Sequence, residues 1–438
     1  MSDENTARHA ECTVEFDGVD ITSSIKPYLL SLTFTDNEED ASDDLQIKLQ
    51  DREGVWMTDW LQKMLDGDVS AASSDGYKVG DVVQFLGGPH YKASTDKKAN
   101  GTPTAGPAKI TIIKQGALHP YHVIHTDGTS RVYGWVDASE ISGKSGGSSS
   151  GSGEGGLKIR ATITACNWHS DGKDEALDCG EFELDSINAS GPPDIITIKA
   201  TGLPYTSQIR QTKQSKGWEK YKLSGIANEM AKKNGMQSQF LAKQDPEYKR
   251  VEQYRCSDID FLSQLCHDAG LSLKCTDGKI VIFDQKEYEG KDSAWTVTKD
   301  DKSYIKWSHT LGQAGTQYAS CRVSYVGPNG KPLEGIAYVK DYDAKSKTNQ
   351  QLEVYAPVTS KAEAKELAAK KLRLHNKFER QVGFTYSGDP GKVAGLTFEA
   401  KDFGPWDGKY IVKQAKHTVT GSGGYTTQVS GRHVLGGY

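Results

Sequence analysis

The sequence predicts a β-rich α+β protein with several domains. At 438 residues the chain is too long for one ordinary core, because single domains usually run to roughly 100–200 residues. Its 46 glycines, 20 tyrosines and 8 tryptophans, together with repeated runs of Val, Ile and Thr, favour β-structure. Segments with helical periodicity separate the strand-like stretches, so both element types are expected.

The chain begins with strand-like alternation. In CTVEFDGVDIT, Val14 and Phe16 share one face and Asp17-Gly18 is a hairpin signal. LLSLTFTD and DDLQIKLQD continue the pattern. The acidic loop DNEEDASDD between them lacks EF-hand spacing, so we expect a solvated loop. VWMTDWLQKMLDGD then has the pattern of a short amphipathic helix.

A different kind of sequence interrupts this first domain. Strand-rich text from residue 75 to 142 is followed by a Gly/Ser tract at residues 143–156, which is typical of a flexible linker after an inserted module. Alternating strands resume at LKIRATITACNW. We therefore expect a split first β-domain at residues 1–74 and 157–205.

Residues 206–293 predict an α+β middle domain. KLSGIANEMAKKNG has a helical apolar stripe that ends at Gly235, and Ser257 with Asp260 predicts a capped helix that ends at Gly270. Asp277-Gly278 then predicts a tight hairpin. Residues 294–438 return to strands around one helix, which opens at Ser360 with Glu363 as a capping box. Because both ends predict β-domains with one helix each, we expect one fold to occur twice.

Composition excludes several functions. The formal charge is −5 and the Lys and Arg residues are scattered, which argues against nucleic acid or anionic lipid as a partner. No segment approaches the ~18 apolar residues of a membrane span. Seven cysteines without a C-x-x-C pair indicate reduced thiols rather than disulfides or zinc.

Catalytic signatures are equally scarce. The sequence contains no H-E-x-x-H and no P-loop, its G-x-S-x-G match at residues 147–151 lies in the Gly/Ser tract, and no dinucleotide fingerprint follows a strand. We therefore expect no enzyme, no catalytic residues and no cofactor.

Histidines and aromatic residues gather in the inserted module. HPYHVIH contains His119, His122 and His125, but on a strand His122 points away from the other two, so no metal site is expected. The aromatic residues favour either a ligand groove or simple core packing of a small β-barrel. The candidate groove residues are Tyr91, His119, Tyr121, Tyr133 and Trp135.

The module resembles a known domain class. YKVGDVVQF near its start and VYGWVDASEI at its end resemble bacterial SH3-like domains of phage-tail and cell-wall-associated proteins. This resemblance implies peptidoglycan or peptide binding in a groove lined by Tyr91, Tyr133 and Trp135.

The rest of the chain resembles the phage late control D family, the baseplate hubs of contractile tails. The matching segments are DWLQKMLDGD, LDCGEFELDSINASGPP, RQTKQSKGWEKYKLSGIA, SDIDFLSQLCHDAGLSL, which is also similar to the hub half of valine-glycine-repeat spike proteins, and GPWDGKYIVKQAKHTV. The resemblance implies two tail-tube-like β-barrel domains flanking the α+β module, plus the SH3-like β-barrel insert.

The resemblance also implies a function. The chain would be the structural hub of a phage tail, tailocin or related injection system, assembled in the bacterial cytoplasm. As a homotrimer it would join the hexameric tail tube to the central spike, beside baseplate wedge proteins. Two copies of one fold per chain convert threefold into near-sixfold symmetry. The alternative is a cell-wall-targeting protein that binds peptidoglycan through its insert.

Overall fold

The structure is a computed structural model. It describes residues 7–39, 42–60, 77, 82–114, 117–126, 130–144, 157–169, 172–203, 208–312, 317–327, 330–340, 342–346 and 349–436. Strands outnumber helices throughout these ranges, and the predicted β-rich, multidomain α+β class is confirmed. The Gly/Ser linker lies almost wholly outside the described residues.

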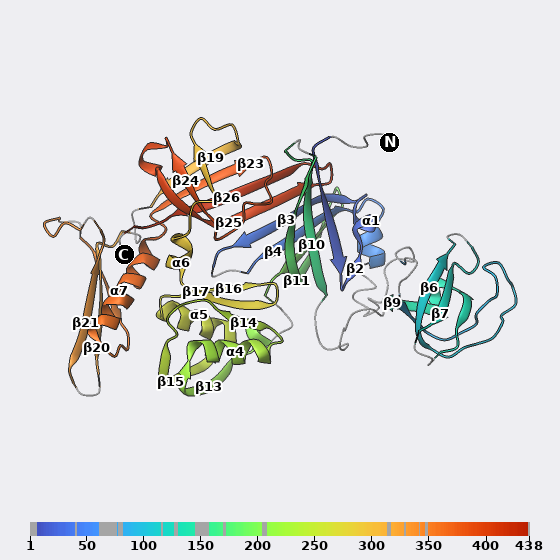
Figure 1. The fold of residues 1–438 in the computed structure, drawn as a ribbon, viewed down its shortest axis with the longest axis horizontal. Coiled ribbons are helices and arrows are strands. Elements are labelled where there is room, and N and C mark those ends of the chain that lie inside the picture. The colour runs from blue at the N-terminus through green and yellow to red at the C-terminus, as the bar shows by residue number, and fades with distance from the viewer. Residues whose placement is uncertain are drawn as a thin grey trace.

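One large sheet runs through both ends of the chain (Figure 1). Its strands from the N-terminal part are β1 (His9–Phe16), β2 (Val19–Asp20), β3 (Leu29–Asn37), β4 (Asp44–Gln50), β10 (Lys158–Cys166), β11 (Asp174–Ser190) and β12 (Ile195–Thr201). Those from the C-terminal part are β18 (Trp295–Thr298), β19 (Tyr304–Leu311), β23 (Arg380–Tyr386), β24 (Thr397–Lys401), β25 (Gly408–Thr420) and β26 (Tyr425–His433). Short helical segments flank these strands: α1 (Thr22–Ile25), η1 (Val55–Trp60) and η3 (Gly404–Trp406).

The two parts of this sheet share one strand order. In the N-terminal part the order is β1-β10-β11-β12-β4-β3, and in the C-terminal part it is β18-β24-β25-β26-β23-β19. When the strands of each part are numbered along the chain, with the two-residue strand β2 left out, both orders read first, fourth, fifth, sixth, third, second. Four of the five pairings are antiparallel in both parts, whereas the first–fourth pairing is antiparallel only in the N-terminal part. We call these parts the first copy and the second copy.

Local irregularities recur at matching places in the two copies. The second strand of each copy has one residue without a partner on the third strand. This residue is Leu30 in β3 and Ile305 in β19. The fifth strand skips one residue against the sixth at Asp185 in β11 and at Lys413 in β25. Because a bulge fixes the register of the strand that carries it, these positions align the two copies residue by residue.

Each copy carries one extra module in a different loop. The first copy holds the insert between its third and fourth strands, built from β5 (Val82–Phe85), β6 (Gly106–Ile113), β7 (Tyr121–His125), β8 (Tyr133–Val136), η2 (Ala138–Glu140) and β9 (Ile141–Lys144). The second copy holds a three-stranded sheet between its second and third strands, formed by β20 (Ser320–Val326), β21 (Pro332–Tyr338) and β22 (Gln351–Tyr355), with α7 (Lys361–Asn376) packed on one face. The helix ends at Asn376.

The middle domain lies under the large sheet (Figure 1). It contains α3 (Gln208–Gln211), β13 (Gln214–Lys222), α4 (Leu223–Lys233), β14 (Gln237–Phe240), β15 (Glu247–Cys256), α5 (Asp258–Asp268), β16 (Ser272–Thr276), β17 (Lys279–Phe283) and α6 (Gln285–Glu289). The predicted cap is present, because Ser257 accepts a hydrogen bond from the backbone N–H of Asp260. Gly235 and Gly270 end their helices at φ values of +68° and +69°, as the sequence predicts.

Five separate groups of buried apolar side chains stabilise these parts. One lies in each copy, one in the middle domain, one in the insert, and one between α7 and its sheet. Val419 and Tyr425 belong to the second copy but pack into the core of the first. The two copies therefore share part of their core.

Candidate functional site

The insert brings only some of the predicted groove residues together. The rings of Tyr91 and His119 stack with centroids 3.5 Å apart. His119 is buried, and its two ring nitrogens lie 2.6 Å from Asp137 Oδ1 and 2.8 Å from the carbonyl oxygen of Asp96. Tyr121 instead points inward and joins the apolar core of the insert. His119 and Tyr121 therefore contribute to the packing of the insert rather than to an exposed groove.

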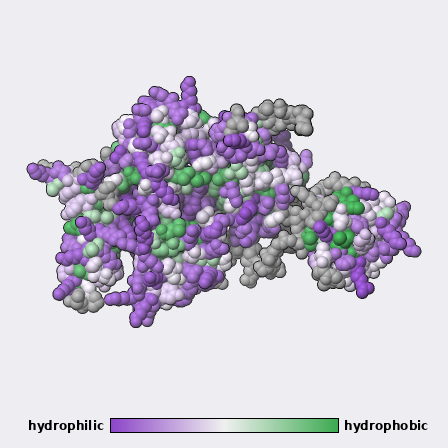
Figure 2. Space-filling model, in the orientation of Figure 1, coloured by the Kyte–Doolittle hydropathy of each residue, from purple (hydrophilic) through white to green (hydrophobic). Residues whose placement is uncertain are grey.

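Tyr133 and Trp135 lie on the outer face of the insert sheet. Trp135 pairs directly with His122 across β7 and β8, and the His122 ring contacts the rings of both Tyr133 and Trp135. Tyr133 is 66% exposed whereas Trp135 is 7% exposed, so Tyr133 is the accessible member. Figure 2 shows hydrophobic residues gathered on the visible face of the insert. The sequence-based set lacks His122, which joins the two aromatic residues.

The joint between the two copies is a strand pairing. Residues 31–37 of β3 pair antiparallel with residues 414–420 of β25, so one ladder of backbone hydrogen bonds crosses from the first copy into the second. Side chains reinforce it: Gln414 donates to Asn37 at 2.8 Å, and the rings of Phe34 and His417 stack. The second strand of one copy thus pairs with the fifth strand of the other.

The corresponding strands, β19 and β11, each have a stretch of edge that is unpaired within the described residues. Within the described residues β19, the second strand of the second copy, pairs only with β23. Ile305, Trp307 and Leu311 on it are exposed. In β11, the fifth strand of the first copy, residues 186–190 pair with β12 on one edge, while β10 covers the other edge only as far as Glu183. Open apolar strand edges favour pairing with another chain.

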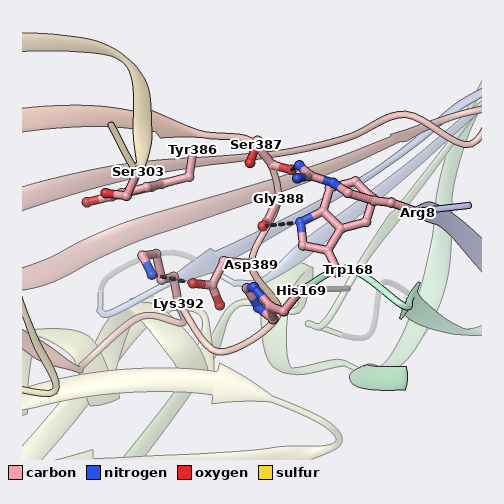
Figure 3. Close-up of a pocket in the computed structure, with 9 residues that line it drawn as sticks. All are labelled: Arg8, Trp168, His169, Ser303, Tyr386, Ser387, Gly388, Asp389 and Lys392. Atoms are coloured by element: carbon pink, nitrogen blue, oxygen red, sulfur yellow. Dashed lines mark hydrogen bonds and ion pairs between the residues drawn. The ribbon is translucent and has the colours of Figure 1, made fainter. Parts of the chain in front are cut away.

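A cavity of about 200 Å³ lies at the seam between the copies (Figure 3). The Arg8 guanidinium lies 4.1 Å from the ring centre of Trp168, and Trp168 Nε1 donates to the Gly388 carbonyl at 2.8 Å. Lys392 pairs with Asp389 and lies over the Tyr386 ring. These contacts join β1, the turn after β10 and the loop after β23. They hold the two copies together at the seam.

Within the described residues, Asp36, Glu38 and Asp43 of the acidic stretch are buried, and the expectation of a solvated loop was wrong for them. Its carboxylates meet cations from the middle domain and the second copy: Lys274 lies 2.6 Å from Asp36 and 3.3 Å from Asp43, while Arg432 lies 2.6 Å from Glu38. Lys377 pairs with Glu39, which also accepts from Ser272 at 2.6 Å. The loop therefore ties three parts of the chain together.

A second group of ion pairs extends the network. Arg432, which is fully buried, also pairs with Glu289 at the end of α6, and Arg373 of α7 lies 2.9 Å from Asp284. Burial raises the pKa of Glu38, although Arg432 opposes the shift. Burial likewise raises the pKa of Asp43 to about 6, against the attraction of Lys274. Such charges are tolerated only because partners surround them.

The family model for the phage tail baseplate hub (GPD) matches residues 200–423 of the chain. This range covers half of the sequence. The chain belongs to the phage tail baseplate hub family. The hub family is structural, and its members form part of the tail baseplate, so the protein is a structural component of a virion or tail particle.

Solved structures show the same fold at low sequence identity. The tail protein of Neisseria meningitidis MC58 is 8% identical with a TM-score of 0.57, and the match covers 97% of each chain. The 43 kDa tail protein of prophage MuSo2 from Shewanella oneidensis is 11% identical with a TM-score of 0.53. This match covers 97% of the present chain and 98% of the MuSo2 protein. No curated protein sequence matches the chain.

Proposed function

We propose that the hub chain forms a homotrimer whose six sheet copies close a ring between the tail tube and the central spike. The observation that carries the proposal is the internal joint between β3 and β25. It pairs the second strand of one copy with the fifth strand of the other. The equivalent strands, β19 and β11, carry open edges within the described residues.

The aligned bulges give the register of the proposed contact between subunits. Inside the chain Thr35 lies opposite Lys416. Leu30 corresponds to Ile305, and Lys413 corresponds to Asp185. Transferring the pairing therefore places Thr310 of one subunit opposite Asn188 of the next. Three such contacts alternate with three internal joints, and the ring closes with the open stretches of β19 and β11 covered.

The test uses the two side chains that would face each other. Thr310 and Asn188 are both exposed within one chain, so substitution there should leave the fold of a single chain intact. Like charges directly opposite each other on paired strands are destabilising. We expect Thr310→Lys combined with Asn188→Lys to prevent trimer formation, and Thr310→Glu with Asn188→Lys to retain it.

Mass photometry or light scattering of the chain, alone and mixed with its tail tube and spike proteins, measures the outcome. Lys306→Glu on the same strand is the control, because it changes charge outside the proposed Thr310–Asn188 pair. Trimers that form equally well with both double variants would contradict the proposed register. A wild-type chain that stays monomeric even with both partners would contradict the ring itself.

For the division of the chain we propose the sequence-based boundaries: 1–74 with 157–205, 75–142, 143–156, 206–293 and 294–438. The separate apolar cores support this division. Within the last range, α7 and its sheet have a further core of their own. Baseplate wedge proteins are the proposed neighbours of such peripheral modules. We propose no catalytic role, in keeping with the structural character of the family.

A second proposal concerns the insert, which resembles SH3-like domains. We propose that its outer face binds peptidoglycan through Tyr133 and the adjoining Trp135, since aromatic faces suit sugar rings and peptide stems. The exposure of Tyr133 favours this role. Tyr133→Ala should remove sedimentation of the full chain with purified cell walls, whereas Tyr325→Ala on β20 should not. Equal sedimentation of both variants would contradict the proposal.

A further inference from the structure

Three side chains with metal-binding atoms meet on one face of the first copy. His9 on β1 lies directly opposite Cys166 on β10, and Glu11 follows His9 by two residues on the same strand face. One ligand atom from each residue lies within 4.8 Å of the others. This group is the only one of its kind among the described residues.

The histidine is oriented for binding. His9 Nδ1 lies 3.0 Å from the backbone carbonyl oxygen of Ala7, and a carbonyl can only accept, so Nδ1 carries the proton. Nε2 therefore presents its lone pair, and it lies 3.8 Å from Glu11 Oε1. A backbone acceptor on the second ring nitrogen is the usual arrangement for a metal-ligating histidine.

The ligand types select the metal. One imidazole nitrogen, one thiolate sulfur and one carboxylate oxygen suit zinc, whereas magnesium and calcium prefer oxygen alone. Bonds of about 2.0–2.3 Å in a tetrahedron separate ligand atoms by roughly 3.5 Å. Small side-chain rotations would therefore bring the three atoms into place. We propose that His9, Glu11 and Cys166 bind one zinc ion, with water as the fourth ligand.

The ion pair between Glu11 and Lys26 competes with the zinc ion, and it is weak. Lys26 lies 3.1 Å from Glu11 Oε1, but both side chains are at least half exposed, and exposed ion pairs contribute about 1 kcal/mol or less. Burial, with Asp174 and Glu11 nearby, raises the pKa of the Cys166 thiol. Zinc binding would displace that proton into solvent as the thiolate–zinc bond forms.

The site lies beside the seam between the two copies. The backbone N–H of Ala10 donates to the Gly423 carbonyl at 2.9 Å, in the turn between β25 and β26. A zinc ion would therefore fix the start of β1 to β10 at the point where both contact the second copy. Zinc should stabilise the folded chain, because a ligand that binds only the folded state raises its stability.

The experiment measures zinc in the full chain, without an added histidine tag and after treatment with a chelator. Titration calorimetry and elemental analysis should give one zinc per chain. Cobalt in place of zinc should give a thiolate-to-metal charge-transfer band. Cys166→Ser and His9→Gln should each lose the ion and the zinc-dependent rise in melting temperature. Cys256→Ser, which changes a half-buried free cysteine on β15, should keep both.

Glu11→Gln provides a variant that should leave the fold intact, since Glu11 is exposed. It should weaken zinc binding while the melting temperature of the metal-free chain stays unchanged. Zinc that binds equally to Cys166→Ser would overturn the proposal, as would zinc that is lost from His122→Gln instead. Absence of stoichiometric zinc in the wild-type chain would also overturn it. None of these outcomes depends on the proposed trimer.

Discussion

Gly388 occupies a position that only glycine fits. Its φ is +92°, and a Cβ atom there would lie 2.5 Å from Tyr425 Cδ1 and 2.8 Å from Trp168 Cζ2. Both rings belong to the seam between the copies, and neither is free to move because each is buried. The backbone itself is used as well, since the Gly388 carbonyl accepts from Trp168.

We therefore predict that Gly388→Ala lowers the free energy of unfolding by roughly 2–4 kcal/mol, from backbone strain and overpacking together. Urea unfolding followed by tryptophan fluorescence measures it. Gly18→Ala is the control: its φ is +77° but no atom lies within 4 Å of the added Cβ, so it should cost only about 1 kcal/mol. Equal losses would show that packing at the seam contributes nothing.

His417 predicts a dependence of stability on pH. Burial lowers its pKa from 6.5 to about 4, and its Nδ1 lies 2.7 Å from the Tyr425 hydroxyl. Because the unfolded chain binds the proton more readily, the free energy of unfolding falls as pH decreases from 6.5 to 4. The contribution of His417 to that fall is at most about 3 kcal/mol. His417→Gln should make the pH profile flatter over this range.

Asp43 acts with the opposite sign and supplies the control. Its pKa is raised from 3.8 to about 6 by burial, so the folded chain binds the proton more readily. The stability that it contributes is full below pH 3.8 and is lost as pH rises through 6. Asp43→Asn should therefore make the free energy of unfolding fall more steeply as pH decreases. If both variants shifted the profile in the same direction, these two titrations would not be its cause.

Residue patterns in the sequence predicted local structure well. The caps at Ser257 and Ser360 and the turn at Asp277-Gly278 all form, because each depends on neighbours within four residues. The grouping of His9 with Cys166 was not predictable, since a strand pairing across the whole insert creates it. Its only sequence signal is the H-x-E spacing on one strand face.

At the scale of elements, the acidic loop acts as a connector. It lies between β3 and β4, yet its partners come from β16, from Lys377 directly after α7, and from β26. The sequence misled us here because carboxylates are usually solvated, and the cations that surround them lie more than 200 residues away in the chain. Burial of a charged loop is a tertiary property that local composition does not contain.

The network makes a prediction about Arg432. Arg432→Leu would leave Glu38 and Glu289 buried without their main cation, and breaking a buried pair in this way costs about 3–5 kcal/mol. Arg322→Leu is the matched control, because Arg322 pairs with Glu334 and Glu353 on an exposed sheet face and should cost less than about 1 kcal/mol. Thermal and urea unfolding measure both variants. Similar costs would contradict the importance of burial.

Strand positions were more predictable than strand partners. Alternation indicated most strands of the large sheet, because one face of each is apolar. The pairing of β3 with β25 was beyond such reasoning, since any two alternating strands can pair and the choice depends on the whole fold. The expectation of one fold at both ends came from the pattern of strands with one helix at each end, and the shared strand order gives it a topological basis.

At the scale of the whole molecule, the insert stands apart. Its apolar core shares no residue with that of the first copy, and it lies to one side of the body in Figure 1. Among the described residues, no helix is long and apolar enough to cross a membrane. The insert is thus an added module, and we call the rest of the chain the body.

We predict that replacing residues 75–156 by a short Gly/Ser linker leaves the melting temperature of the body within a few degrees of its original value, since a flexible surface loop changes little in closure entropy. Calorimetry of both chains checks this. The full chain should show a separate unfolding transition for the insert, which the shortened chain lacks. A large loss of stability in the body would mean that the insert forms part of its core.

The extra modules leave the two copies from different loops, and neither interrupts the ladder that joins β3 to β25. Each half of the chain thus carries its own added module while both halves keep one strand order. In the proposed trimer the two modules would alternate around the ring, and each would recur every third of a turn. Replacement of one module by another would then change what the particle binds without changing how it assembles.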